Sequence, residues 1–145
     1  MKNYFLTIDT ETTQNNLVAD FAATITDKHG NIVAQCAVLI AGVYGKHPLF
    51  FDSTAPPNSV WSAEGKDKRE QIYNAMLDSG TRMLASVPAV NSWLLKAYHQ
   101  YKPVLTAYNL AFDVDKCSKT GIDLNPFTRR FCLWYAACDV LGKSK

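Results

Sequence analysis

Two apolar segments separated by a short polar turn constrain the fold of this chain more than any other feature. Residues 17–26 and 32–40 are rich in Val, Ile, Ala and Thr, and the sequence Asp-Lys-His-Gly-Asn lies between them at 27–31. This pattern predicts an antiparallel β-hairpin, because β-branched residues favour strands while Asp, Gly and Asn favour turns. Residues 3–9 are of the same apolar kind and predict a strand before the hairpin.

The rest of the chain combines helical spacing with one more strand. The apolar pattern predicts helices from 66 to about 79, at 88–100, 109–119 and 131–141, a strand at 103–108, and a long irregular loop at 42–63. With 145 residues, of which 48% are hydrophobic, the chain can bury a core of its own. We therefore expect one α/β domain over residues 1–145, in which helices flank a mixed sheet with an antiparallel hairpin plus a parallel strand.

Charge and cysteine content exclude several classes of protein. The formal net charge of +2 excludes a basic nucleic-acid tail and a polybasic membrane anchor. The four cysteines form no Cys-x-x-Cys pair, which argues against a zinc site. The first apolar run meets Asp9 too early for a signal peptide, and no run is long enough to cross a bilayer. We expect a cytoplasmic protein with free thiols and no membrane contact.

Two acidic residues stand at the end of the first predicted strand. Side chains alternate along a strand, so Asp9 and Glu11 project to one side and Thr10 to the other. Two carboxylates this close repel each other unless a hard divalent cation such as Mg²⁺ lies between them. The pair therefore predicts a cation site, and the alternative of two solvated acids at a polar strand end stays open on this motif alone.

A third carboxylate follows the later predicted strand. Asn109 and Asp113 are four residues apart, so a helix that begins here places both on one face beside the strand end. Phe112 either packs in the core or lies under a bound base. Asp113 is either an acid on a helix surface or a partner of the first two carboxylates.

Together, the two motifs resemble those of the DEDD, or DnaQ-like, superfamily of 3′-to-5′ exonucleases. Residues 9–12 (Asp-Thr-Glu-Thr) are similar to the first motif of that family, and residues 109–113 (Asn-Leu-Ala-Phe-Asp) are similar to the second. The hairpin, helices and strand between them follow the order found in the family. The resemblance covers the chain from Tyr4 to Asp113.

The resemblance implies an RNase H-like fold and phosphodiester hydrolysis with two Mg²⁺ or Mn²⁺ ions. Asp9 would bridge both ions, Glu11 would bind the ion that activates the attacking water, and Asp113 would support the second ion. The substrate would be the 3′ end of single-stranded DNA or of a short RNA. Residues of the two motifs would hold its terminal nucleotide: Thr12, Thr13, Asn109 and Phe112.

The third motif of the family is an Asp on a late helix, preceded by a His or Tyr that orients or deprotonates the water. Tyr135 and Asp139 match its Tyr form, one helical turn apart. Only 26 positions separate Asp113 from Asp139, fewer than is usual in the family. We therefore favour a packing helix in which Trp134 and Leu141 face the core. The chain is then either a shortened member of the family or a C-terminally incomplete part of a longer nuclease.

Basic residues are more frequent in the later part of the chain. Residues 96–145 contain eight Lys and Arg against four acids. We expect four of them to lie on the face of the carboxylates and to guide phosphates there, with a distant solvated face as the open alternative: Lys116, Lys119, Arg129 and Arg130.

Two functions follow from these observations. The first is a metal-dependent 3′-to-5′ exonuclease acting on single-stranded ends. The alternative is a catalytically impaired nuclease-like module that binds nucleic-acid ends or a protein partner, which the weak third motif favours. The retained carboxylates argue for the enzyme, because a binding module gains nothing from a costly acidic cluster.

Overall fold

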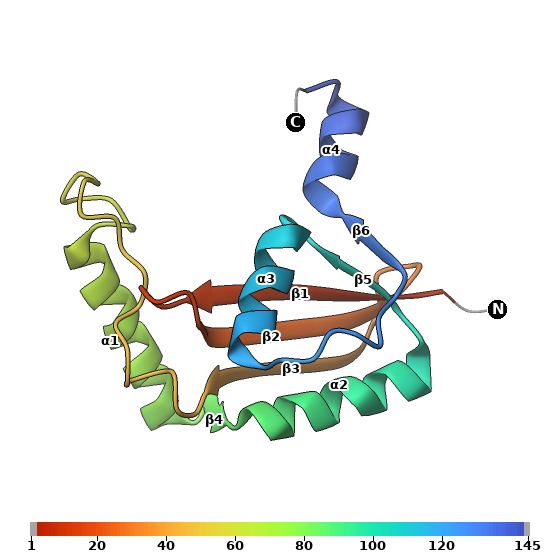
Figure 1. The fold of residues 1–145 in the computed structure, drawn as a ribbon, viewed down its shortest axis with the longest axis horizontal. Helices are drawn as coiled ribbons and strands as arrows, with labels where there is room; N and C mark the ends of the chain where they lie inside the picture. The colour runs from red at the N-terminus through yellow and green to blue at the C-terminus, as the bar shows by residue number, and fades with distance from the viewer. Residues whose placement is uncertain (1–2, 144–145) are drawn as a thin grey trace.

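Within residues 3–143, which the computed structural model describes, six strands form one mixed sheet and four helices lie around it (Figure 1). The strands are arranged in the order β4-β3-β2-β1-β5-β6. Along the chain the elements are β1 (Tyr4–Thr12), β2 (Val18–Asp27), β3 (Ile32–Ile40), α1 (Ala63–Ser79), β4 (Met83–Ala85), α2 (Val87–Tyr101), β5 (Val104–Ala107), α3 (Leu110–Thr120), β6 (Arg130–Cys132) and α4 (Leu133–Leu141).

The predicted hairpin is confirmed, since β2 and β3 are antiparallel and β1 lies antiparallel to β2. At the turn between β2 and β3, the Asp27 carboxylate accepts hydrogen bonds from the backbone N–H groups of His29 and Asn31, at 2.8 and 3.0 Å. Gly30 has a φ of 84°, in the left-handed region that glycine occupies without strain. The polar pentapeptide therefore sets the hairpin register.

Parallel pairings extend this sheet on both sides. β5 pairs in parallel with β1, β6 with β5, and β4 with β3. The predicted strand at 103–108 and the four predicted helices are confirmed. β4 and β6 were not predicted, because each has three residues and is too short for an alternating pattern to be recognised. The result is an α/β fold with an RNase H-like arrangement of its mixed sheet and helices.

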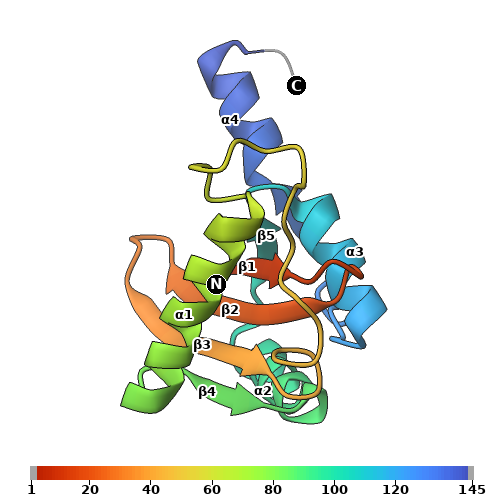
Figure 2. The ribbon, with the colours of Figure 1, turned by 90° about the vertical axis from the view of Figure 1, so that its left-hand side faces the viewer.

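The two faces of the sheet are covered differently. Figure 2 shows α1 and α3 on opposite sides of the strands. The face toward α2 and α3 carries the main core, to which α2 contributes Val90, Leu94 and Ala97. The large side chains buried in this core include Leu6, Ile8, Phe21, Ile25, Leu105 and Phe127. The opposite face is approached by α1 near the last residues of β1.

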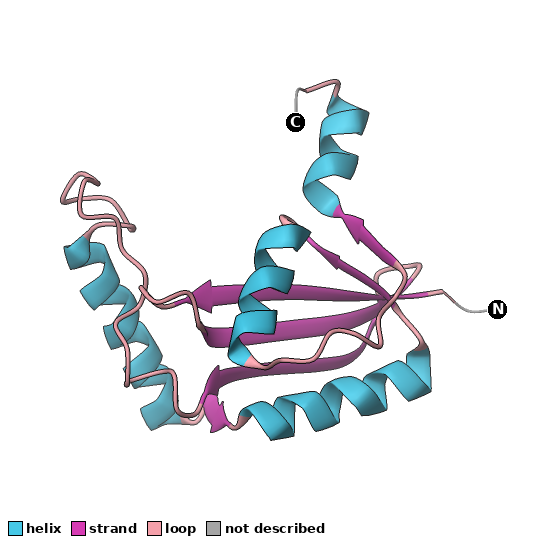
Figure 3. Ribbon diagram, viewed as in Figure 1, coloured by secondary structure: helices cyan, strands magenta, loops and turns pink. Residues whose placement is uncertain are grey.

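The irregular loop predicted at 42–63 is confirmed at 41–62, and the segment runs beside α1 (Figure 3). It leads into α1 at Ser62, whose hydroxyl accepts a hydrogen bond from the Gly65 backbone N–H at 3.0 Å. A Cβ on Gly65 would lie 2.4 Å from the Ser59 carbonyl oxygen. The end of the segment therefore packs directly against the first turn of the helix.

Helix α4 extends away from the sheet (Figures 1 and 2). Leu141 is 68% exposed, so the prediction that it faces the core is wrong. The backbone N–H of Trp134 bonds to the Tyr108 carbonyl oxygen at 2.9 Å and the two rings lie 6.5 Å apart, so α4 is attached at its start while its later turns pass beyond the sheet. No helix in residues 3–143 has the length and apolar character needed to span a membrane.

Candidate functional site

The last residues of β1 bring acidic side chains together on one face of the sheet. β1 continues past the predicted end at residue 9, so Asp9 and Glu11 lie within the strand. Glu11 pairs directly with Asp20 of β2, and residues paired across antiparallel strands point to the same face. Asp9 is exposed, whereas Asp20 is buried. Sequence reasoning missed Asp20, although a single acid inside an apolar strand is a signal that could have identified it.

Asp113 reaches β1 from the other face. β5 pairs with β1 only as far as Thr7. Beyond Thr7, the same edge of β1 is open to the first turn of α3. The Thr10 hydroxyl donates a hydrogen bond to Asp113 Oδ1 at 2.7 Å, and the Thr10 backbone N–H bonds to the same carboxylate. Asp113 is 6% exposed. Its carboxylate therefore ties the start of α3 to β1.

The half-buried Glu11 and the buried Asp20 have cationic partners. Arg69 Nη1 of α1 donates to Glu11 Oε2 at 3.1 Å. Asp20 Oδ2 accepts hydrogen bonds from the Tyr73 hydroxyl at 2.7 Å and from Arg82 Nη2 at 3.3 Å. None of these partners was predicted, because they lie 53 to 62 positions from the acids along the chain and nothing local marks them.

The acids influence one another electrostatically. Burial raises the pKa values of Glu11, Asp20 and Asp113 above their ordinary values, and the negative charge of Asp9 raises all three further. The Arg69 guanidinium opposes this rise at Glu11. Asp9 is thus the common neighbour of the other three carboxylates, and a cation beside it would relieve their repulsion.

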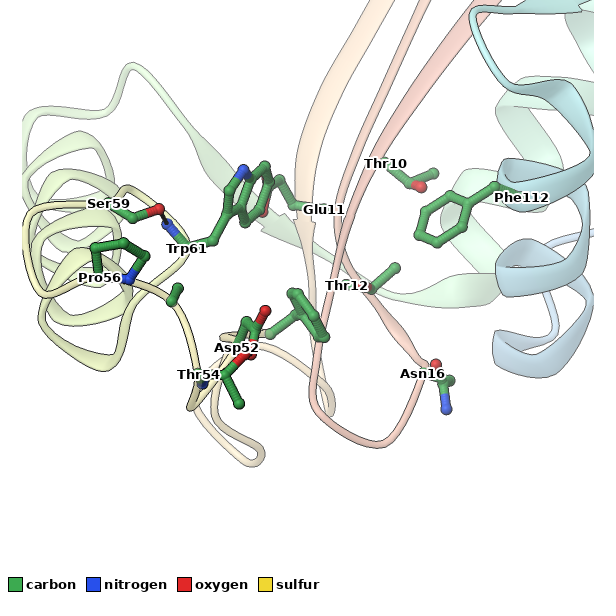
Figure 4. A pocket seen from close by; sticks show the side chains of 12 residues that line it. Thr10, Glu11, Thr12, Asn16, Asp52, Thr54, Pro56, Ser59, Trp61 and Phe112 are labelled. Atoms are coloured by element: carbon green, nitrogen blue, oxygen red, sulfur yellow. Dashed lines mark hydrogen bonds between the residues drawn. The ribbon is translucent and has the colours of Figure 1, made fainter. Parts of the chain in front are cut away.

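A cleft of about 690 Å³ opens between the 50–61 segment and the start of α3 (Figure 4). Glu11 and Thr12 of β1 line it. Trp61, 46% exposed, stands on the side of the 50–61 segment, and Phe112, 43% exposed, stands on the side of α3 (Figure 4). Phe112 is therefore no core residue, and the cleft combines a carboxylate with aromatic rings that a base could stack on.

Only some of the residues predicted to hold the terminal nucleotide lie at the cleft. Thr12 and Phe112 line the cleft, and Thr13 and Asn109 do not. The Thr13 hydroxyl accepts a hydrogen bond from the Leu17 backbone N–H at 3.1 Å and so anchors the turn between β1 and β2. Asn109 is exposed at the N-cap position of α3, where its side chain makes no capping bond.

The two residues predicted from the third motif lie on α4. Tyr135 and Asp139 are one turn apart on this helix, as predicted. No residue of α4 lines the cleft, and the helix extends away from the sheet (Figure 1). Neither Tyr135 nor Asp139 is therefore among the residues that line the cleft, and their part in the site stays a prediction from the sequence.

The basic residues separate into two groups. Lys116 Nζ donates to Asn16 Oδ1 at 3.0 Å and lies 5.0 Å from the centre of the Phe112 ring, so its charge stands at the cleft. Arg129 and Arg130 instead bind backbone carbonyl oxygens around the start of β6. Arg130, the first residue of β6, is aligned across the sheet with Leu105 of β5 and Leu6 of β1. Because a strand rises about 3.3 Å per residue, the two arginines are remote from the last residues of β1.

The acids fit Mg²⁺ or Mn²⁺ in donor type, because carboxylate oxygens are the ligands these ions prefer. Within residues 3–143, however, no three His, Cys, Asp or Glu side chains form a group that could hold an ion as they stand. Glu11 is turned toward Arg69 and Asp113 toward Thr10. A cation between them would share each carboxylate with its present side-chain partner, which engages one of the two oxygens.

Comparison with known proteins leaves the family of the chain open. No protein-family model matches the chain, and no curated protein matches it either.

Proposed function

We propose that the protein is a metal-dependent 3′-to-5′ exonuclease that hydrolyses terminal phosphodiesters of single-stranded DNA or short RNA. The observation that carries the proposal is that Glu11, a member of the acidic cluster, and the exposed Phe112 ring line the same cleft. Carboxylates hold the divalent ions that phosphodiester hydrolysis uses, and an exposed ring stacks on bases of any sequence. The resemblance of the two motifs to DEDD exonucleases supports the same reaction.

Each residue of the proposed site has a role in this chemistry. Asp9, Glu11 and Asp113 hold two Mg²⁺ or Mn²⁺ ions. Bound ions of this kind lower the pKa of water and neutralise charge on the attacking and leaving oxygens. Phe112 stacks on the terminal base, and the Lys116 ammonium beside it attracts the phosphates. Completion of the site by Tyr135 and Asp139 remains a prediction from the sequence.

The test is degradation of a 5′-labelled single strand by the whole chain with Mn²⁺ or Mg²⁺. Asp9→Asn keeps the shape of the side chain and removes its charge, so we expect the rate to fall on the order of 10²-fold or more. Asp78→Asn makes the same change at an exposed position on α1 outside the cleft and should leave the rate unaltered. Equal rates for Asp9→Asn and the wild type would reject the proposed site.

A second function is favoured by one observation. Glu11 is engaged by the Arg69 guanidinium and Asp113 by the Thr10 hydroxyl, so protein groups occupy both carboxylates. A catalytically impaired nuclease-like module that binds nucleic-acid ends or a protein partner would have this arrangement. Binding of the labelled strand without degradation at any Mn²⁺ concentration would identify it.

We also propose that the protein acts in the cytoplasm. Its four cysteines are free thiols, and reducing compartments keep thiols in this state. Fractionation of cells that produce the tagged chain would test this assignment.

A further inference from the structure

Arg69 makes more contacts around the cleft than its ion pair with Glu11. Its Nε donates to the Val60 carbonyl oxygen at 3.1 Å, and its Nη2 donates to the Phe50 carbonyl oxygen at 2.6 Å. Its guanidinium lies 5.0 Å from the centre of the Trp61 ring. All three guanidinium nitrogens are therefore used, each toward a different part of the chain, and the side chain is 16% exposed.

The two carbonyl groups belong to the two ends of one closed segment. The Asp52 backbone N–H bonds to the Trp61 carbonyl oxygen at 2.7 Å, which closes the segment at its base. The Phe50 and Trp61 rings lie edge to face, 6.3 Å apart, and both line the cleft. We call this aromatic pair, Phe50 and Trp61, the loop wall. Arg69 is the side chain at which α1, the loop wall and Glu11 of β1 meet.

We propose that Arg69 is a positioning residue that fixes the loop wall relative to Glu11, so that a base of a single strand enters the cleft opposite Phe112 while its phosphate lies at the carboxylates. This inference rests on the proposed function. It adds that substrate affinity depends on a residue of α1 that need not touch the substrate. The two ends of the 50–61 segment and strand β1 would then all be held by the Arg69 side chain.

The planar guanidinium suits this role and an ammonium group does not. Arginine presents donors in a rigid fork and stacks on an aromatic face, whereas lysine offers one point charge on a flexible stem. In Arg69→Lys the ion pair with Glu11 can persist, but the bonds to the Phe50 and Val60 carbonyls and the stacking on Trp61 are not reproduced together. Lysine therefore separates the positioning role from simple charge compensation at Glu11.

The test compares wild type and Arg69→Lys with a short single-stranded thymidine oligomer. In steady-state degradation with Mn²⁺, we expect Arg69→Lys to raise KM about tenfold with kcat changed by less than about threefold. Acrylamide quenching of the free protein supplies a second readout, because Trp61 should become more accessible once its stacking partner is lost. Trp61→Phe in both backgrounds assigns the quenching signal to this residue. Lys68→Gln, an exposed charge change next to Arg69 on α1, should alter neither readout.

A double-mutant cycle links the two parts of the proposal. Trp61→Ala alone should raise KM, and adding Arg69→Lys should raise it little more, because both changes remove the same wall. A KM for Arg69→Lys equal to that of wild type, unchanged quenching, or strictly additive effects would each overturn the role of Arg69. A wild-type chain that neither degrades nor binds the oligomer would overturn the proposed function instead, while the quenching of the free protein would still report on the loop wall.

Discussion

Asp9 is the exposed member of a group of acids whose other members, Glu11, Asp20 and Asp113, are wholly or partly buried. Burial disfavours their charged forms, and partners on α1, β1 and the segment before β4 compensate only in part. Ionising these buried and half-buried groups therefore costs stability. Such an arrangement is common at functional sites, where charge is retained for binding or chemistry.

The first prediction concerns pH and stability. The pKa values of Glu11, Asp20 and Asp113 are raised on folding from ordinary values of 4.5, 3.8 and 3.8, so folding favours their protonated forms. The stability that these three groups contribute is fully present at pH values below their pKa in the unfolded chain. It is lost as the pH rises through their raised pKa in the folded protein. We expect Tm without added metal to fall on the order of 5 °C as pH rises from 4 through these raised values.

A thermal melt across pH 4 to 8 checks this expectation. Asp113→Asn should make the fall shallower, whereas Asp78→Asn should not. Hydrogen bonds from the side chains of Asn31 and Thr54 lower the pKa values of Asp27 and Asp52, so the opposite effect of these two acids is confined to pH below about 3.8. A Tm that rises steadily from pH 4 to 8 would contradict the raised pKa values.

Among the elements, α1 and the segment before it contribute most to the shape of the cleft. The helix begins where Ser62 caps it, and Gly65 allows the Ser59 and Val60 carbonyls to approach its first turn. The same helix then presents Arg69 to the Phe50 carbonyl. The position of one wall of the cleft is therefore set by close backbone packing at the start of a helix.

The element-scale prediction is that Gly65→Ala disturbs this packing. The new Cβ would meet backbone atoms of residues 59 and 60 within 2.6 Å, and backbone cannot yield as a flexible side chain does. We expect a loss of about 1–3 kcal/mol in the free energy of unfolding, measured by urea denaturation, although Ala is the better helix former. Gln71→Ala, at an exposed position of the same helix, should be close to neutral. A stabilised Gly65→Ala variant would show that the segment moves freely.

The sequence could predict helices and strands in which apolar residues recur at a regular spacing. It could not predict contacts between elements that are distant along the chain. The hairpin followed from β-branched runs around a turn, and Asp9 and Glu11 followed from alternation in β1. Arg69 could not be found in this way, because its role arises only when α1 packs beside β1. Leu141 was placed wrongly, since an apolar helix face shows that burial is favourable but not what it packs against.

At the scale of the whole molecule, basic charge is distributed unevenly around the cleft. Lys116 stands beside Phe112, while Arg129 and Arg130 hold backbone carbonyls near the start of β6. The two arginines thus stand level with the first half of β1, and the grouping of all four basic residues on the face of the carboxylates stays a prediction. A small net charge of +2, with Lys116 beside Phe112, suits the proposed short strand end better than an extended duplex.

The whole-molecule prediction is that Lys116 supplies part of the salt dependence of binding. Lys116→Gln should reduce the slope of log affinity against log salt by about 0.7 for a single strand, which corresponds to one lost phosphate contact. Binding of a fluorescent thymidine oligomer between 50 and 200 mM salt, a range in which phosphate contacts show clearly, measures this slope. Lys96→Gln, on the exposed surface of α2, should leave it unchanged. Equal slopes for both variants would place the phosphates elsewhere.

The hydrogen bond from Thr10 to Asp113 also determines at what stage of synthesis and folding the proposed site can form. It joins residues 103 positions apart, and contacts of such long range are closed late because the chain must first lose the entropy of a long loop. A growing polypeptide carries Asp9 and Glu11 from the outset of synthesis but cannot assemble the cleft until α3 has been made. The proposed site is therefore complete only once β5 and α3 have been made, and a half-made chain lacks Asp113 beside the acids of β1 and β2.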